Sequence, residues 1–313
     1  MRFASWAVNR LLQAVVALVA LTALAFLLLR SAPGDPARAV AGPRATDETI
    51  AAVRESMGLD QSVVVQYVRY LQRLARGDLG MNSSGTARVA DQVTNGVWPT
   101  LALVVCASLL VFVLAIALTI WSVQRPSGIV DRAIRTFAIG GMALPSFWVG
   151  LVLITFVALP TGWFPVGGWP ADPAERVRAL VLPSVSLALA FGPPALRSLR
   201  SSVLGVLDTD YVAAARVMGV SRVRFWRTYV LRNAFVPSVP VFAIVVAAML
   251  GASVVVEATF NLPGLGTLLA SAALSRDVNL MQGTTLLLGI GVLVIYFAAD
   301  VVVALLDPRV KVS

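Results

Sequence analysis

The chain has 313 residues, of which 58% are hydrophobic and 13% are charged. Soluble domains average about 45–50% apolar and about 25% charged residues, so this composition excludes an ordinary soluble domain and indicates a membrane protein. There is no histidine, one cysteine (Cys106) and one lysine (Lys311), which excludes internal disulfides, Cys/His metal sites and histidine-based nucleophile pairs. No P-loop surrounds Lys311, so any ATP must be bound by another chain. Cys106 lies in an apolar run and is predicted to be buried and unreactive.

The first apolar run, residues 11–29, carries no charge and follows Arg2 and Arg10. A signal peptide is the alternative, but its apolar core would have about 7–15 residues and a small-residue cleavage site after it. This run is longer and ends without such a site. We therefore favour a spanning helix over residues 1–30.

Residues 31–97 are more polar and are predicted to form a small helical subdomain outside the membrane. One helix is predicted to begin after Thr46, a capping residue, and to end at Gly58. A second amphipathic helix is predicted to stop near Gly77. Its apolar face is predicted to consist of Val64, Tyr67, Val68, Leu71 and Leu74.

Five further apolar runs follow in a predicted core at 98–313. They cover residues 101–121, 136–159, 179–196, 233–256 and 278–299, and each is long enough to cross about 30 Å of hydrocarbon. The second contains Gly140, Gly141 and Pro145, so we expect one kinked span there. The prediction is an all-α polytopic protein with six transmembrane helices.

The formal net charge of +9 is unevenly distributed. With the N-terminus inside, the segments between spans on that side hold 14 basic and four acidic residues, whereas the other side holds 11 of each. The positive-inside rule therefore places both termini in the cytoplasm, and the charge is better explained by orientation than by nucleic-acid binding.

The loop between the fourth and fifth spans, at about 206–235, is predicted to form two short helices. Asp208 or Thr209 can cap the first, Gly219 can end it with a positive φ, and Ser221 can cap the second. The sequence thus predicts an elbow that projects into the cytoplasm. A solvated basic loop that merely obeys the orientation rule is an equally open interpretation.

The elbow resembles the coupling loop of permease subunits of bacterial ABC importers in the dipeptide, oligopeptide and nickel branch. The resemblance rests on Ala214-Ala215 and Gly219 at their spacing, with Leu231-Arg232-Asn233-Ala234 after them. Further motifs of the branch follow in chain order. They are Pro33-Gly34-Asp35-Pro36, Gly58-Leu59-Asp60, Arg76-Gly77-Asp78-Leu79-Gly80, Pro145-Ser146-Phe147-Trp148, Pro263-Gly264-Leu265-Gly266 and Asp307-Pro308-Arg309. The usual acidic residue of the coupling motif is replaced by Ala213, and a usual proline by Arg232.

This resemblance implies a non-enzymatic transport subunit in the bacterial cytoplasmic (inner) membrane. It forms half of a pathway for di- or oligopeptides, and nickel or glutathione are the alternatives. The implied partners are a second homologous permease, ATP-binding subunits that hold ATP-Mg inside, and an extracytoplasmic solute-binding protein. The resemblance implies no cofactor in this chain, and it implies that membrane lipid surrounds the protein. The implied ATPase-coupling residues are Asp210, Tyr211, Ala213, Ala214, Ala215, Arg216, Gly219, Ser221 and Arg222.

Four residues are candidates for the pathway or its gate. Pro145 and Trp148 belong to the kinked third span, where a kink can line a pathway or simply pack. Glu257 ends the fifth span and can serve an outer gate, although we favour a solvated helix end. Asp300 lies inside the last span, where an ionisable residue is costly, and we favour an ion pair with an inner arginine.

Other classes of membrane protein fit less well. A secondary transporter would need an internal repeat and several intramembrane charges. A membrane enzyme would need convergent nucleophiles or metal ligands. A channel subunit fits the composition but does not explain the elbow.

Overall fold

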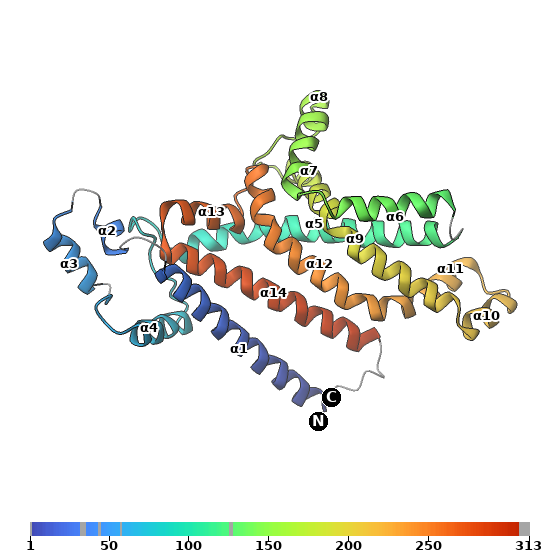
Figure 1. Cartoon of the computed structure of the whole chain (residues 1–313), viewed down its shortest axis with the longest axis horizontal. Coiled ribbons are helices and arrows are strands. Elements are labelled where there is room, and N and C mark those ends of the chain that lie inside the picture. The colour runs from blue at the N-terminus through green and yellow to red at the C-terminus, as the bar shows by residue number, and fades with distance from the viewer. Residues whose placement is uncertain (1, 32–35, 43–44, 57, 125–127, 307–313) are drawn as a thin grey trace. The chain divides into compact units, whose positions relative to one another are not determined.

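The computed structural model describes residues 2–31, 36–42, 45–56, 58–124 and 128–306. The motif residues 33–35 and 307–309 and Lys311 lie outside these ranges. Within them, every regular element is a helix (Figure 1). The helices are α1 (Arg2–Ser31), α2 (Pro36–Ala41), α3 (Asp47–Ser56), α4 (Val63–Ala75), α5 (Val89–Val123), α6 (Ile129–Gly141), α7 (Ser146–Leu153), η1 (Ile154–Ala158), α8 (Leu159–Thr161), α9 (Pro173–Leu207), α10 (Asp210–Val217), α11 (Arg222–Arg224), η2 (Phe225–Leu231), α12 (Arg232–Thr259), α13 (Leu265–Ser275) and α14 (Val278–Leu306). Of these, η1 and η2 are π-helical turns.

Four helical stretches of the described chain are long and apolar enough to cross a membrane. They are Val89–Val123, Pro173–Leu207, Arg222–Thr259 and Val278–Leu306. The predicted spans at 101–121, 179–196, 233–256 and 278–299 each lie inside one of them. The predicted first span lies within α1, whose apolar part is the shorter stretch Leu12–Leu27.

The predicted third span is two helices rather than one kinked helix. The first, α6, ends at Gly141, and the second, α7, begins after Pro145 (Figure 1). Proline lacks a backbone N–H and disfavours helical geometry at the residue before it, and the glycine pair adds little helix propensity. The apolar stretch after the break, Ser146–Thr161, has 16 residues and is shorter than an ordinary span.

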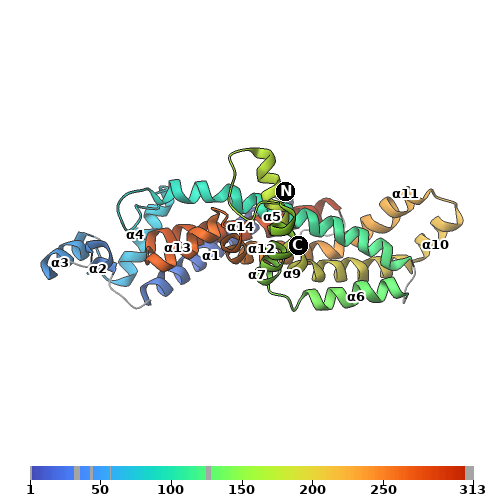
Figure 2. The ribbon, with the colours of Figure 1, turned by 90° about the horizontal axis from the view of Figure 1, so that it is seen from above.

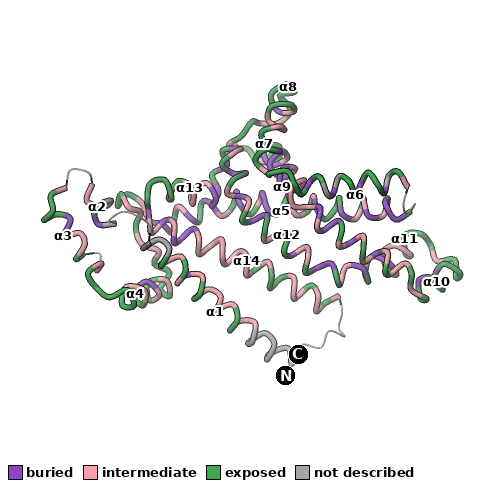
Figure 3. The backbone as a smooth tube through the Cα atoms, viewed as in Figure 1, coloured by how far each residue is buried: buried purple, intermediate pink, exposed green. Residues whose placement is uncertain are grey.

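The chain divides into two compact units. Unit 1 contains residues 101–262 and the part of α14 from Gly291 onward. In unit 1, α9 packs against α6, α7 and α12, and buried residues follow one another along α9 (Figure 3). A central core includes Leu103, Leu187, Met249 and Phe260. A second cluster, here called the inner core, consists of Ala115, Val123, Ile134, Ala138, Leu196, Leu199, Val203, Val230 and Ala234.

Unit 2 contains residues 8–100 and 263–290. Its core is formed by Val89, Val93, Leu265, Ala272 and Leu280, which come from α5, α13 and α14. Asp277, at the start of α14, accepts hydrogen bonds from the Leu280 N–H (3.1 Å) and the Ser83 N–H (2.8 Å). This carboxylate therefore ties the loop around residue 83 to the beginning of the last long helix.

The predicted helices of residues 31–97 are present. Thr46 accepts a hydrogen bond from the Thr49 N–H (3.3 Å), and Gly58 ends the turn after α3 with φ +65°. The second helix is α4, and its predicted apolar face is only partly covered. Tyr67 donates a hydrogen bond to the Val19 carbonyl of α1 (2.9 Å), whereas Val64 and Val68 are exposed, because α1 covers only one side of the apolar arc.

The prediction of a buried Cys106 is also wrong. Its side chain lies on the exposed side of α5, beside the exposed residues Val105 and Leu109. A helix whose outer side faces lipid is apolar on its exposed surface too, so an apolar neighbourhood in the sequence does not fix the buried side.

A close backbone contact in unit 1 joins the segment before α9 to the end of α12. The Gly168 N–H donates to the Phe260 carbonyl at 2.9 Å, and a Cβ added at Gly167 would lie 2.3 Å from the same oxygen. Only glycine fits at Gly167 unless this seam opens.

Replacing Gly167 with alanine should therefore destabilise unit 1. We expect Gly167→Ala to cost about 1–3 kcal/mol, as overpacking usually does, and to lower the thermal unfolding midpoint of the purified protein by a few degrees. Gly251→Ala is the matched control, because an added Cβ at this helical position meets nothing within 4 Å. Equal midpoints for the two variants would contradict this interpretation of the seam.

Candidate functional site

The segment between α9 and α12 forms a helical hairpin at one end of unit 1 (Figures 1 and 2). Residues 208–231 are here called the elbow. The chain leaves α9 at Leu207, forms α10, turns at Gly219, and returns through α11 and η2 into α12. The two predicted short helices are thus present, and the elbow is continuous with two helices of the core.

One face of α10 anchors it to the rest of unit 1. Val212 and Ala215 are buried, and their spacing of three places them on the same side of the helix. Arg216 lies over the ring of Phe225, with 5.4 Å between its guanidinium carbon and the ring centroid. Phe225 in turn packs against the inner core. The first helix of the elbow is therefore fixed to the returning chain by packing and by a cation–π contact.

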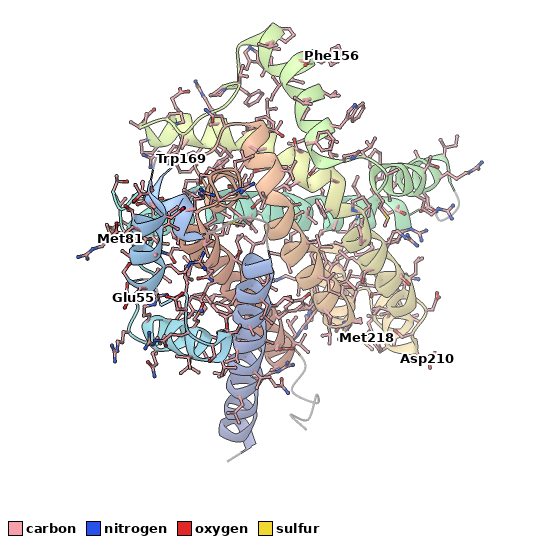
Figure 4. All side chains as sticks on the ribbon, turned by 60° about the vertical axis from the view of Figure 1, so that its left-hand side comes forward. Glu55, Met81, Phe156, Trp169, Asp210 and Met218 are labelled. Atoms are coloured by element: carbon pink, nitrogen blue, oxygen red, sulfur yellow. The ribbon has the colours of Figure 1, made fainter. Side chains whose placement is uncertain are left out.

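The opposite face of the elbow is exposed and apolar. Val217, Met218 and Val223 are 89%, 75% and 77% exposed, and they are here called the apolar tip. Tyr211, Ala213 and Ala214 are also exposed on α10. Asp210 and Met218 both lie at the free edge of the hairpin (Figure 4). Val217 and Met218 lie at the end of α10, and Val223 lies on α11.

Gly219 ends α10 as the sequence predicts. Its φ is +66°, and the Gly219 and Val220 N–H groups donate to the carbonyls of Arg216 (3.1 Å) and Ala215 (3.3 Å). An added Cβ would meet nothing within 4 Å in this chain. Glycine is therefore required here for its backbone conformation, because side chains with a Cβ adopt this region at a cost.

The predicted capping residues occupy the expected positions but cap differently. Thr209 precedes α10, yet its hydroxyl donates backward to the Val206 carbonyl (2.6 Å). Ser221 precedes α11 without a side-chain capping bond. Asp210 and Arg222 are exposed in the first turns of their helices. Thr209 thus fastens the elbow to the end of α9 instead of satisfying the start of α10.

The π-helical turn η2 was not predicted. It covers Phe225–Leu231 directly before α12, and the Asn233 side chain donates to the Tyr229 carbonyl there (2.8 Å). No spacing in the sequence distinguishes a π turn from an α turn at this point. Such turns are frequent at functional sites.

The four candidate pathway residues are distributed over three helices. Pro145 and Trp148 are exposed at the start of α7, and Asp300 is half-buried near the end of α14. Glu257 is fully buried, so the expectation of a solvated helix end is wrong. The reason is that the chain folds back over the end of α12, where the Leu262 N–H donates to the Glu257 carbonyl (2.8 Å). Among the described residues, no group of three metal-ligating side chains comes together.

Comparison with known proteins identifies the family. The family model for the binding-protein-dependent transport system inner membrane component matches residues 114–312, and the model for the N-terminal part of such components matches residues 2–89. The chain is 33% identical over 306 residues to a probable peptide ABC transporter permease of Sinorhizobium fredii (97% of this chain, 98% of that protein). It is 34% identical over 311 residues to a glutathione transport system permease of Salmonella paratyphi A (98% and 99%).

An oligopeptide transport system permease of Bacillus subtilis is 32% identical over 315 residues (98% of this chain, 99% of that protein). Among solved structures, a chain of the MetNI methionine ABC transporter in an inward-facing conformation is similar in fold, with a TM-score of 0.57 and 22% identity over 69% of this chain and 96% of that chain. The protein therefore belongs to the family of multi-pass inner membrane components of binding-protein-dependent ABC transport systems.

Proposed function

We propose that this chain is one transmembrane half of an ATP-driven importer for peptides. The observation that carries the proposal is the elbow, an anchored helix with an apolar tip that extends from the two helices α9 and α12. A second permease subunit would form the other half of the pathway. An extracytoplasmic binding protein would deliver the peptide, with residues 31–97 as the subdomain on that side.

The elbow is proposed to receive the movement of a separate ATPase. The chain has one lysine, Lys311, outside any P-loop, so ATP-Mg would be held by the partner. The apolar tip would enter a groove of the ATPase, and the exposed residues Arg216, Arg222 and Arg224 would orient it. Because Val212 and Ala215 fix α10 to the returning chain, a push on the tip would reach α9 and α12 together.

Peptides are the proposed substrates because the relatives are named for substrates that contain peptide bonds. The names include peptide, oligopeptide and glutathione permeases. Glutathione is the second candidate on the same ground. Nickel is less favoured, because the chain has no histidine and its single cysteine, Cys106, lies on the exposed side of α5, and no group of three metal-ligating side chains comes together among the described residues.

Uptake measurements in the native bacterium test the proposed substrate. We expect deletion of this gene to abolish uptake of radiolabelled di- or oligopeptides and complementation to restore it, because half of the pathway is lost. Labelled dipeptide, tripeptide, hexapeptide, glutathione and ⁶³Ni²⁺ should be compared in parallel at the same concentration. If uptake of all the peptides is unchanged and only that of Ni²⁺ or glutathione falls, the peptide assignment is wrong.

Cysteine labelling tests the proposed orientation. In a Cys106→Ala background, we expect Ser84→Cys to react with a membrane-impermeant maleimide in intact spheroplasts. Asp208→Cys, on the elbow but outside the apolar tip, should react only after the membrane is opened. Both positions are exposed, so accessibility within the chain does not limit either reaction. The reverse pattern would overturn the proposed topology.

Substitution of Gly219 tests the proposed coupling. We expect Gly219→Val to reduce peptide uptake at least tenfold, because a β-branched residue resists the φ of +66°, at a cost of about 1–2 kcal/mol or more. Gly219→Asn should retain most of the uptake, since asparagine tolerates this conformation. Both variants should reach the membrane in normal amounts. Full uptake by Gly219→Val would remove the coupling role of this turn.

A further inference from the structure

The inner ends of three helices of unit 1 meet at a buried carboxylate. Asp131, in the first turn of α6, is 1% exposed. Its Oδ1 accepts from the Nε (3.0 Å) and the Nη2 (2.8 Å) of Arg200 on α9, and the Ser122 hydroxyl of α5 donates to the same oxygen. Ser122, Asp131 and Arg200 are here called the inner clamp.

The members of the inner clamp also contact one another, and Arg135 and the partly exposed Arg200 connect the clamp to solvent. The Arg200 Nε also donates to the Ser122 oxygen (2.8 Å). The second oxygen of Asp131 lies 3.4 Å from the half-exposed Arg135. Both oxygens of the buried carboxylate thus have a charged partner, as a buried ionic group requires.

Helix packing at this level does not need the clamp. Ile134, Ala138, Leu196 and Leu199 bring α6 and α9 together in the inner core. A buried ion pair is a weak source of net stability, because desolvation of both charges offsets their attraction, and apolar side chains of similar volume often replace it without loss. The clamp is better explained by the direction it imposes on the helices than by the stability it adds.

The position of Arg200 connects the clamp to the elbow. Arg200 lies seven residues, or two helical turns, before Leu207, where α9 ends. Apolar side chains can slide past one another, since their contacts have no direction. A carboxylate with two bonds to one guanidinium cannot slide without leaving a buried charge unpaired. Any displacement of α9 that keeps these bonds therefore moves α6 and α5 with it.

We propose that the inner clamp is the link that carries movement of the elbow from α9 to α5 and α6, so that Asp131 and Arg200 act as positioning residues in energy coupling. The inference rests on the proposed coupling role of the elbow. The clamp makes the inner ends of three helices move as one body when the ATPase pushes. Without it, α9 moves and the other two lag behind.

The decisive variant replaces the pair with apolar residues of similar size, Asp131→Leu with Arg200→Met, in the complete complex reconstituted in proteoliposomes. We expect the complex to assemble in normal yield and to hydrolyse ATP within twofold of the wild-type rate. Uptake per ATP hydrolysed should fall at least tenfold. Arg132→Met, an exposed neighbour on α6, is the matched control and should leave this ratio unchanged. Unchanged uptake per ATP in the double variant would overturn the proposal.

A charge exchange provides a second test if the apolar pair does not assemble. Asp131→Asn and Arg200→Met should each impair uptake per ATP. Asp131→Arg with Arg200→Asp restores an ion pair and should recover at least a third of the lost ratio. Equal impairment in the exchanged variant and the single variants would count against a directional link.

A distance measurement separates this inference from the identity of the substrate. Spin labels at Ala133→Cys on α6 and Ser201→Cys on α9, both exposed positions, should report the same separation with and without bound ATP in the complex that has the clamp. In the complex with the apolar pair, the separation should change on ATP binding. A constant separation in both complexes would refute the clamp even if uptake is confirmed. If the wild-type complex assembles and its helices move but peptides are not taken up, the proposed substrate fails and the clamp stands.

Discussion

The structure depends on one constraint, which is that a backbone in lipid must satisfy its hydrogen bonds within the protein. The long apolar stretches of the described chain are all helices for this reason. Two buried hydroxyl groups of the long helices are satisfied in the same way, since Ser186 and Thr284 donate to carbonyls one turn earlier, those of Leu182 (2.9 Å) and Leu280 (2.7 Å). Irregular backbone occurs where helices end, for example at residues 142–145 and in the loops around residues 83 and 167, and the chain changes direction at such places.

The two helices that flank the elbow, α9 and α12, are also the two that pack closely in unit 1. This arrangement gives the elbow a rigid base. Thr209 fastens it to the end of α9, and Phe225 fastens it to the inner core. A projecting segment with such a base can transmit force, whereas a solvated loop of the same length would bend. The alternative interpretation, in which the basic segment at about 206–235 is only a solvated loop, is therefore the weaker one.

Much of this fold could be predicted from the sequence, because apolar runs and helix-ending glycines are local signals. Gly58 and Gly219 have the positive φ that their positions predict. The apolar run continues across Pro145 and so predicts one kinked span, although the proline also signals the complete break that the structure has before α7. The burial of Glu257 and the side of α4 that is covered depend on distant segments that fold over them. The meeting of Asp131 with Arg200 joins residues 69 positions apart, and no local pattern encodes such a contact.

The exposed tip of the elbow also bears on how the cell must make this protein. In the proposed complex the ATPase covers Val217, Met218 and Val223. Without the ATPase, these side chains leave an exposed apolar surface. A copy synthesised in excess of the proposed partner would present this surface to chaperones and proteases on the side where that partner binds. The amount of this subunit would then be set by the supply of its partner. The exposure of these three side chains would therefore require balanced synthesis of the two proteins.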